Sequence, residues 1–119
     1  MQMVKGKITI ADLNKMSKNM FDWLVKAVVD IKKEMLIVDA QMHADEEKEL
    51  LEQGSKQEDL WGANLYPNNT LEERIEYLSL INIRPQQNNR QMYISDKEIR
   101  EKVKYIVYTL LLLPNEQMA

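Results

Sequence analysis

The chain has one histidine, and it stands beside a run of acids that could supply a general base or part of a metal site. We take His43, Glu46 and Asp59 as candidate catalytic groups. The His-Glu-x-x-His zinc pattern is absent and the chain has no cysteine, so we predict no metal and no cofactor. A nucleophile, base and orienter could be assembled from Ser55, His43 and Asp59. Ser55 follows Gly54, however, outside any Gly-x-Ser-x-Gly elbow, and ordinary turn chemistry explains it equally well.

A second polar group consists of asparagines and arginines around a proline. Asn82 and Arg84 precede Pro85, and Asn89 and Arg90 follow in the segment 86–91, which has no apolar residue. Asparagine and arginine are the residues that read base edges and hold phosphates. We therefore interpret 86–91 as an exposed loop that either binds an anion or nucleic acid or is a plain solvated loop.

The charge of the chain is uneven. Residues 43–59 carry seven acids against two lysines, and residues 84–104 carry six bases against three acids. The net charge is −3, which argues against nucleic acid as the partner. The two segments indicate either two solvated faces of opposite sign or an anion site near the basic segment.

These residues must be positioned by elements that hydrophobic spacing predicts. The predicted helices and strands are a helix over about 10–22, strands over 25–31 and 35–41, a short helix over about 46–53 capped by Asp45, strands over 60–66 and 74–84, and a long helix from about 96 to 113. The order is helix, hairpin, helix, hairpin, helix. We therefore predict an α+β fold with a four-stranded, mostly antiparallel sheet packed by three helices.

The second predicted hairpin has one apolar and one mixed face, because strand residues alternate between faces. The odd-numbered residues are nearly all apolar and should form the main core face. The even-numbered ones include Asn64, Tyr66, Asn82 and Arg84, which we predict to bind a ligand, unless this is simply a solvated sheet face. Pairing Tyr66 with residue 74 would place Asn64 opposite residue 76, and Gly62 in mid-strand indicates a bulge or a close approach.

Size and composition predict one domain over 1–119, with an ordered core at about 8–113 and a frayed tail at 114–119. Residues 1–7 lack the apolar stretch of a signal peptide. The longest apolar run, 105–113, is far shorter than the roughly 20 residues of a membrane span. We therefore expect a cytoplasmic protein without a membrane segment.

Three stretches resemble one known family. They are His43-Ala44-Asp45-Glu46-Glu47, Gly54 to Pro67 (GSKQEDLWGANLYP) and Ile81-Asn82-Ile83-Arg84-Pro85. Together they are similar to a family of small prokaryotic proteins, a domain of unknown function. The resemblance spans roughly residues 8–110 and implies a single soluble bacterial or archaeal domain. It implies no activity.

The residues leave three functional hypotheses open. The first is a binding domain that holds an anionic small ligand, a peptide or a protein partner on the mixed face and the loop 86–91. The second is a small hydrolase or nuclease-like enzyme that uses His43 and nearby acids, with Arg84 and Arg90 on an anionic substrate. The third is a structural homodimer formed through the last helix, whose run 105–113 is apolar around most of its circumference.

Overall fold

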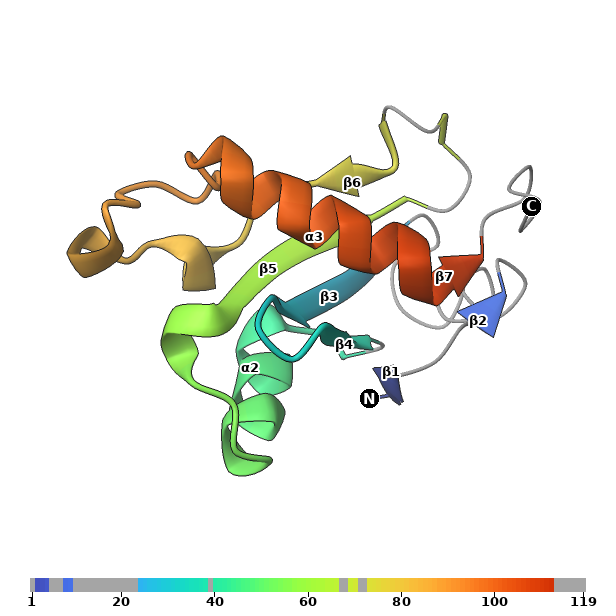
Figure 1. Cartoon of the computed structure of the whole chain (residues 1–119), viewed down its shortest axis with the longest axis horizontal. Coiled ribbons are helices and arrows are strands. Elements are labelled where there is room, and N and C mark those ends of the chain that lie inside the picture. Colours follow the sequence, from blue (N-terminus) through green and yellow to red (C-terminus); the bar gives the residue numbers. More distant parts are fainter. Residues whose placement is uncertain are drawn as a thin grey trace.

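The computed structural model describes residues 2–4, 8–9, 24–38, 40–66, 69–70 and 73–112 (Figure 1). Its main feature is a five-stranded sheet in the order β1-β4-β3-β5-β6, with every neighbouring pair antiparallel. The strands are β1 (Gln2–Val4), β3 (Val25–Asp30), β4 (Met35–Val38), β5 (Leu60–Leu65) and β6 (Ile75–Glu76). A separate parallel pair joins β2 (Ile8–Thr9) to β7 (Leu111–Leu112).

Two α-helices cover opposite faces of this sheet, α2 (His43–Glu52) and α3 (Lys97–Leu110). Figure 1 shows α3 lying across β5 and β3. The α3 face of the sheet carries the larger core, in which Trp61 and Leu65 pack with Val103, Ile106 and Val107 of the helix. This confirms the predicted apolar face of β5 and the predicted helix at the end of the chain.

The opposite face, called here the α2 face, carries a smaller apolar cluster and the site residues. Val28, Ile37 and Leu60 of the sheet pack there with Leu50 of α2 and with Ile81. Ile81 belongs to a 3-10 turn, η3 (Leu80–Asn82). The mixed face is thus covered by a helix and a turn, and it is not a plain solvated face.

The β3–β4 connection is organised by a buried aspartate. Asp30 is fully buried, and its Oδ1 accepts hydrogen bonds from the N–H groups of Lys32 and Lys33 at 2.9 and 2.8 Å. Its Oδ2 accepts a bond from the Ser55 hydroxyl at 2.6 Å. Glu34 takes a left-handed φ of 54°, so four residues suffice to reverse the chain into the antiparallel pair.

The helix α2 begins earlier than predicted and ends where predicted. Met42 is its N-cap residue, so the prediction that Asp45 caps the helix is wrong, and Asp45 instead lies in the first turn, where the helix dipole favours acids. At the other end Gly54 has φ +100°. Its N–H donates to Leu51, and that of Ser55 donates to Leu50, the pattern of a Schellman stop.

The predicted fourth strand is wrong beyond its first residues. Only Ile75–Glu76 pair with β5, and the chain then turns through η3 and a second 3-10 turn, η4 (Pro85–Gln87). Asn82 and Arg84 therefore do not sit on a strand beside Asn64. Where the strand does exist, the predicted register is confirmed, because Asn64 pairs with Glu76.

The α+β prediction with an antiparallel sheet is confirmed, and so are two of the predicted helices. The first helix, predicted over about 10–22, falls on residues outside those described, so three helices and the complete predicted order of elements are not confirmed. Within the described ranges, no helix has both the length and the apolar content needed to cross a membrane.

Candidate functional site

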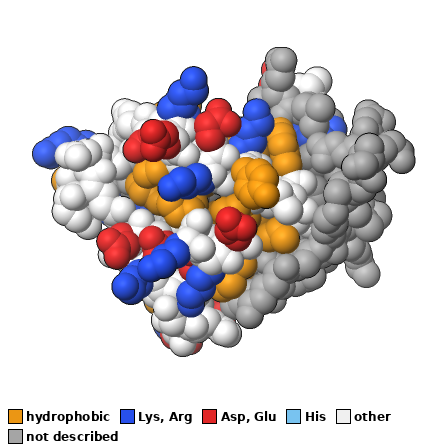
Figure 2. Space-filling view, in the orientation of Figure 1, with side chains coloured by type: hydrophobic (Ala, Val, Ile, Leu, Met, Phe, Trp, Pro, Cys, Tyr) orange, Lys and Arg blue, Asp and Glu red, His pale blue; other side chains and the backbone are white. Residues whose placement is uncertain are grey.

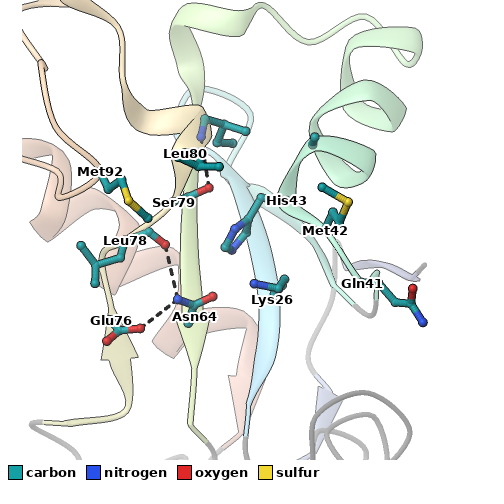
Figure 3. A pocket seen from close by; sticks show the side chains of 12 residues that line it. Lys26, Gln41, Met42, His43, Asn64, Glu76, Leu78, Ser79, Leu80 and Met92 are labelled. Carbon is teal, nitrogen blue, oxygen red and sulfur yellow. Dashed lines mark hydrogen bonds between the residues drawn. The ribbon is translucent and has the colours of Figure 1, made fainter.

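A pocket of about 380 Å³ opens on the α2 face, between the first residues of α2 and the segment that follows β6. Its polar lining residues are Lys26, Gln41, His43, Asn64, Glu76 and Ser79. Its apolar lining residues are Met42, Ala44, Leu78, Leu80, Ile81 and Met92. In Figure 3, Met42 and Met92 stand on opposite sides, with His43, Asn64 and Lys26 between them.

Strand register explains why three of the polar groups form a row. Lys26 of β3 pairs with Asn64 of β5, and Asn64 pairs with Glu76 of β6. Directly opposed residues on one face have Cβ atoms about 5 Å apart. The floor of the pocket is therefore a cation, an amide and a carboxylate on three adjacent strands.

Glu76 is the acceptor on which two neighbouring donors converge. Its Oε1 accepts from Asn64 Nδ2 at 2.9 Å and from the Tyr66 hydroxyl at 3.0 Å. Partial burial, followed by the hydrogen bond to Glu76, raises the pKa of Tyr66, so this hydroxyl stays protonated and keeps donating. Asn64 Nδ2 also points at the carbonyl of Leu78, at 3.4 Å. Asn64 Oδ1 is shielded from solvent and has no hydrogen-bond partner in the structure.

His43, the first residue of α2, sits in this pocket and points at the sheet. Its Nε2 lies 2.7 Å from the carbonyl oxygen of Ala63. Because a carbonyl only accepts, Nε2 carries the proton, and the lone pair of the neutral ring lies on Nδ1. Burial, offset in part by the bond to Ala63 and reinforced by the charge of Lys26, lowers the pKa of His43 to about 4. The imidazole is therefore neutral near pH 7.

The rim of the pocket is apolar and open to solvent. Leu80 is 70% exposed, Met42 58% and Met92 40%. Exposed apolar side chains around a concave surface are typical of an interaction site, and methionines adapt to ligands of different shape. A ligand that reaches the polar floor of the pocket therefore also contacts this apolar rim.

Asn82 and Asn89, two of the predicted ligand-binding residues, direct their side chains into the protein. Asn82 is fully buried and bonds both main-chain groups of Gly62, at 2.8 Å to the nitrogen and 3.0 Å to the oxygen. Asn89 is 2% exposed. Its amide nitrogen lies 2.8 Å from the Asn82 carbonyl oxygen, and its Oδ1 accepts from the N–H of Ser95 at 2.8 Å.

Arg84 is also directed inward, and Arg90 is exposed. Arg84 is 3% exposed, and its two terminal nitrogens donate to the carbonyls of Gln57 and Leu60. Its guanidinium lies 4.1 Å above the ring centre of Trp61. Burial, partly offset by the charge of Glu47, lowers the pKa of Arg84. Neither arginine lines the pocket, and anion binding by them stays a prediction.

Of the candidate catalytic groups, His43 lines the pocket and the others do not. Ser55 donates to Asp30 and lies past the end of the ten-residue α2, so it is on the order of 15 Å from His43 along the helix axis. Glu46 is buried and accepts from the N–H of Ala40 at 3.3 Å. Neither Glu46 nor Asp59 lines the pocket. Among the residues that the structure describes, no three His, Cys, Asp or Glu side chains cluster as metal ligands do.

The structure therefore brings together Asn64 and His43 from the predicted set and adds Lys26 and Glu76, which sequence reasoning did not select. The predicted register already placed Glu76 opposite Asn64, and this was the signal that could have identified it. Nothing in the local sequence marks Lys26, Leu80 or Met92, because the long-range packing of α2 and residues 78–92 makes them neighbours.

Charges on the side of the molecule that carries α3 are mixed. Figure 2 shows acidic and basic side chains interspersed with apolar ones over the described part of this face. The helix alternates such residues, with Lys97, Arg100 and Lys104 among Glu98 and Glu101. The basic segment predicted from sequence thus does not give this face a field of one sign.

Comparison with curated proteins and with solved structures gives no match. Comparison with family models gives one that matches residues 2–110, which is nearly the whole chain. All residues of the pocket and of the inward-directed asparagine and arginine group lie within this match. The chain therefore belongs to the family described as "Protein of unknown function (DUF5674)".

Proposed function

We propose that this protein is a non-catalytic binding domain that holds a small ligand in the pocket of the α2 face. The observation that carries the proposal is the combination, in one concave site, of a polar row on three strands with exposed Leu80, Met42 and Met92 around it. A volume of about 380 Å³ lies within the range of small-molecule sites. We place this function in the cytoplasm, since the chain has no cysteine.

The state of His43 favours binding over catalysis. A general base works best when its pKa is near the operating pH, and the pKa of His43 is lowered to about 4. The hydroxyl of Ser79, which also lines the pocket, accepts the N–H of Ile81 at 3.2 Å. Arg84, expected to hold an anionic substrate, is instead placed against Trp61. The hydrolase hypothesis therefore has less support than binding.

A small ligand fits better than the two macromolecular alternatives. Within the run 105–113 that suggested a homodimer, Ile106, Val107 and Leu110 pack on their own sheet. Tyr105 is exposed, so less apolar surface is left for a second copy than the sequence suggested. A protein or peptide partner would use the exposed rim, but the polar row lies at the bottom of the pocket, where a small molecule reaches it. Binding of a macromolecule is an alternative outcome of the test.

The test is a fragment screen read by NMR on protein labelled with ¹³C at its methionine methyl groups. Met42 and Met92 flank the pocket (Figure 3), so a ligand bound there must shift both methyl signals. Ala44→Phe should fill the pocket and abolish the shifts, since Ala44 is an exposed lining residue. Lys48→Phe, one turn further along α2 and outside the pocket, is the matched control and should keep them.

Fragments that shift neither signal, or that bind equally well to the Ala44→Phe protein, would contradict the proposal. If no fragment binds but a protein or peptide partner shifts the two methyl signals, the pocket is instead part of a macromolecular interface.

A further inference from the structure

The hydrogen-bonding groups at the floor of the pocket are unequally used. Around Asn64 the donors are directed to protein acceptors. Asn64 Nδ2 and, beside the pocket, the Tyr66 hydroxyl donate to Glu76, and His43 Nε2 donates to Ala63. What these residues leave for a ligand is acceptor capacity. Asn64 Oδ1 has no partner, His43 Nδ1 carries a lone pair, and the carboxylate of Glu76 has more lone pairs than two donors use.

An acceptor shielded from water and without a partner costs free energy, and a ligand that supplies the missing donor recovers it. Asn64 Oδ1 is the acceptor in this position, and Figure 3 shows the Asn64 amide between Glu76 on one side and Lys26 and His43 on the other. A donor placed here would bond Asn64 and lie beside a carboxylate. A ligand carboxylate at this position would place its acceptors against the acceptors of Asn64 and Glu76.

The charges on the pocket floor further restrict the chemical class of the ligand. Lys26 and Glu76 flank Asn64 on adjacent strands, so the floor is positive at one end and negative at the other. A full positive charge beside Asn64 would be attracted by Glu76 and repelled by Lys26, and a full negative charge the reverse, so the row gives neither sign a net advantage. A neutral group with an N–H at the end of the row formed by Asn64 and Glu76 meets the acceptors there without bringing a charge.

Building on the proposed function, we propose that the pocket selects a ligand whose polar group is a neutral amide, with an N–H donated to Asn64 Oδ1 and an apolar part held by Met42, Leu80 and Met92. This reverses the anionic ligand expected from the sequence. The arginines that suggested an anion lie outside the pocket, whereas the amide and the carboxylate line it.

The test compares three probes with the same apolar chain and different polar groups: hexanamide, hexanoate and hexylammonium. Each is titrated at pH 7 into the ¹³C-methionine protein, and the shifts of Met42 and Met92 give its affinity. Hexanamide should bind about tenfold or more tightly than either charged probe. This is the factor expected between a ligand that gives a buried acceptor its hydrogen bond and one that does not. Hexanoate or hexylammonium binding as tightly as hexanamide would overturn the inference.

A variant separates the amide contact from the apolar contacts. Asn64→Leu keeps the size of the side chain and removes Oδ1, so the preference for hexanamide over hexanoate should fall by about fivefold or more, leaving only the part that repulsion by Glu76 supplies. An unchanged preference in this protein would contradict the role of Asn64. If Asn64→Leu does not fold, Glu76→Gln is used instead, and it should improve hexanoate binding relative to hexanamide by removing the negative charge.

The two proposals fail differently in this experiment. If the probes shift Met42 and Met92 but hexanoate binds best, the pocket is a ligand site and only the amide preference is wrong. If none of the three probes shifts either signal, the proposed function fails and the amide preference fails with it.

Discussion

The side-chain amide of Asn82 forms both hydrogen bonds that a neighbouring strand would offer to Gly62. Its Oδ1 accepts from the Gly62 N–H at 2.8 Å, and its Nδ2 donates to the Gly62 carbonyl at 3.0 Å. The strand β6 has already ended at Glu76, so this edge of β5 would otherwise leave two buried main-chain groups without partners. One side chain thus closes the sheet edge beneath the pocket.

Asn82→Ala should therefore destabilise the fold. The substitution leaves the N–H and C=O of Gly62 without their partner in a fully buried position, and we expect a loss of about 2 to 4 kcal/mol in the free energy of unfolding. Urea denaturation followed by circular dichroism measures it. The exposed Gln86 gives a matched control, because Gln86→Ala should change stability by less than about 0.5 kcal/mol. Equal stabilities for the two variants would contradict the structural role of Asn82.

Gly62 is also required to be small. A Cβ added to Gly62 would lie 2.6 Å from the Cβ of Ser79 and 2.8 Å from its Oγ, so Gly62→Ala should cost about 1 to 3 kcal/mol of stability. In a Ser79→Gly background most of that clash is removed, and the same substitution should cost less than half as much. A double-mutant cycle by urea denaturation gives the coupling. Additive effects of the two substitutions would show that the residues are not in contact.

The burial of His43 makes the free energy of unfolding depend on pH in a specific range. Its pKa falls from an ordinary 6.5 to about 4 on folding, so between these values the unfolded chain binds one more proton than the folded one. Above pH 6.5 the residue does not affect stability. As the pH falls from about 6.5 to about 4, its contribution destabilises the fold progressively, by on the order of 2 to 3 kcal/mol in all.

The measurement is simple because the chain has one histidine. The Cε1 proton signal of His43 in ¹H NMR should titrate with a midpoint near pH 4 in the folded protein. In urea, where the chain is unfolded, the same signal should titrate near 6.5 and serves as the internal control. A midpoint near 6.5 in the folded state would contradict the buried contact with Ala63.

A charge introduced at the pocket rim should weaken ligand binding without changing the stability of the fold. Leu80 is 70% exposed, so Leu80→Asp should change the free energy of unfolding by less than about 0.5 kcal/mol. The same change should lower the affinity of a ligand for the pocket by about tenfold, because it places a charge on the apolar rim. Ile83→Asp is the control, since Ile83 is 41% exposed and lies outside the pocket. Equal affinities in the two variants would remove Leu80 from the site.

Much of the sheet could be predicted because the sequence pattern and the local chemistry agree there. The alternation of Trp61, Ala63 and Leu65 predicted the face that packs on α3. The antiparallel register from residues 66 and 74 predicted the pairing of Asn64 with Glu76. These are consequences of a two-residue period and a short connection, and both are readable from a single sequence.

The segment after Glu76 could not be predicted in the same way, because its competing interactions are long-range. The run 75–83 alternates like a strand, yet Ser79 accepts the N–H of Ile81 and Asn82 bonds Gly62, twenty residues away. Buried main-chain groups need partners, and here asparagine and arginine side chains supply them. The same residue types bind ligands, so sequence alone could not separate the two roles for Asn82, Arg84 and Asn89.

The most direct measurement is a crystal structure of the protein with hexanamide. The ligand is expected between Met42 and Met92, with its amide nitrogen within hydrogen-bond distance of Asn64 Oδ1. A ligand bound elsewhere, such as at the hollow lined by Ile31, Glu101 and Tyr105 beside α3, with the pocket of the α2 face empty, would contradict the proposal that this pocket is the functional site.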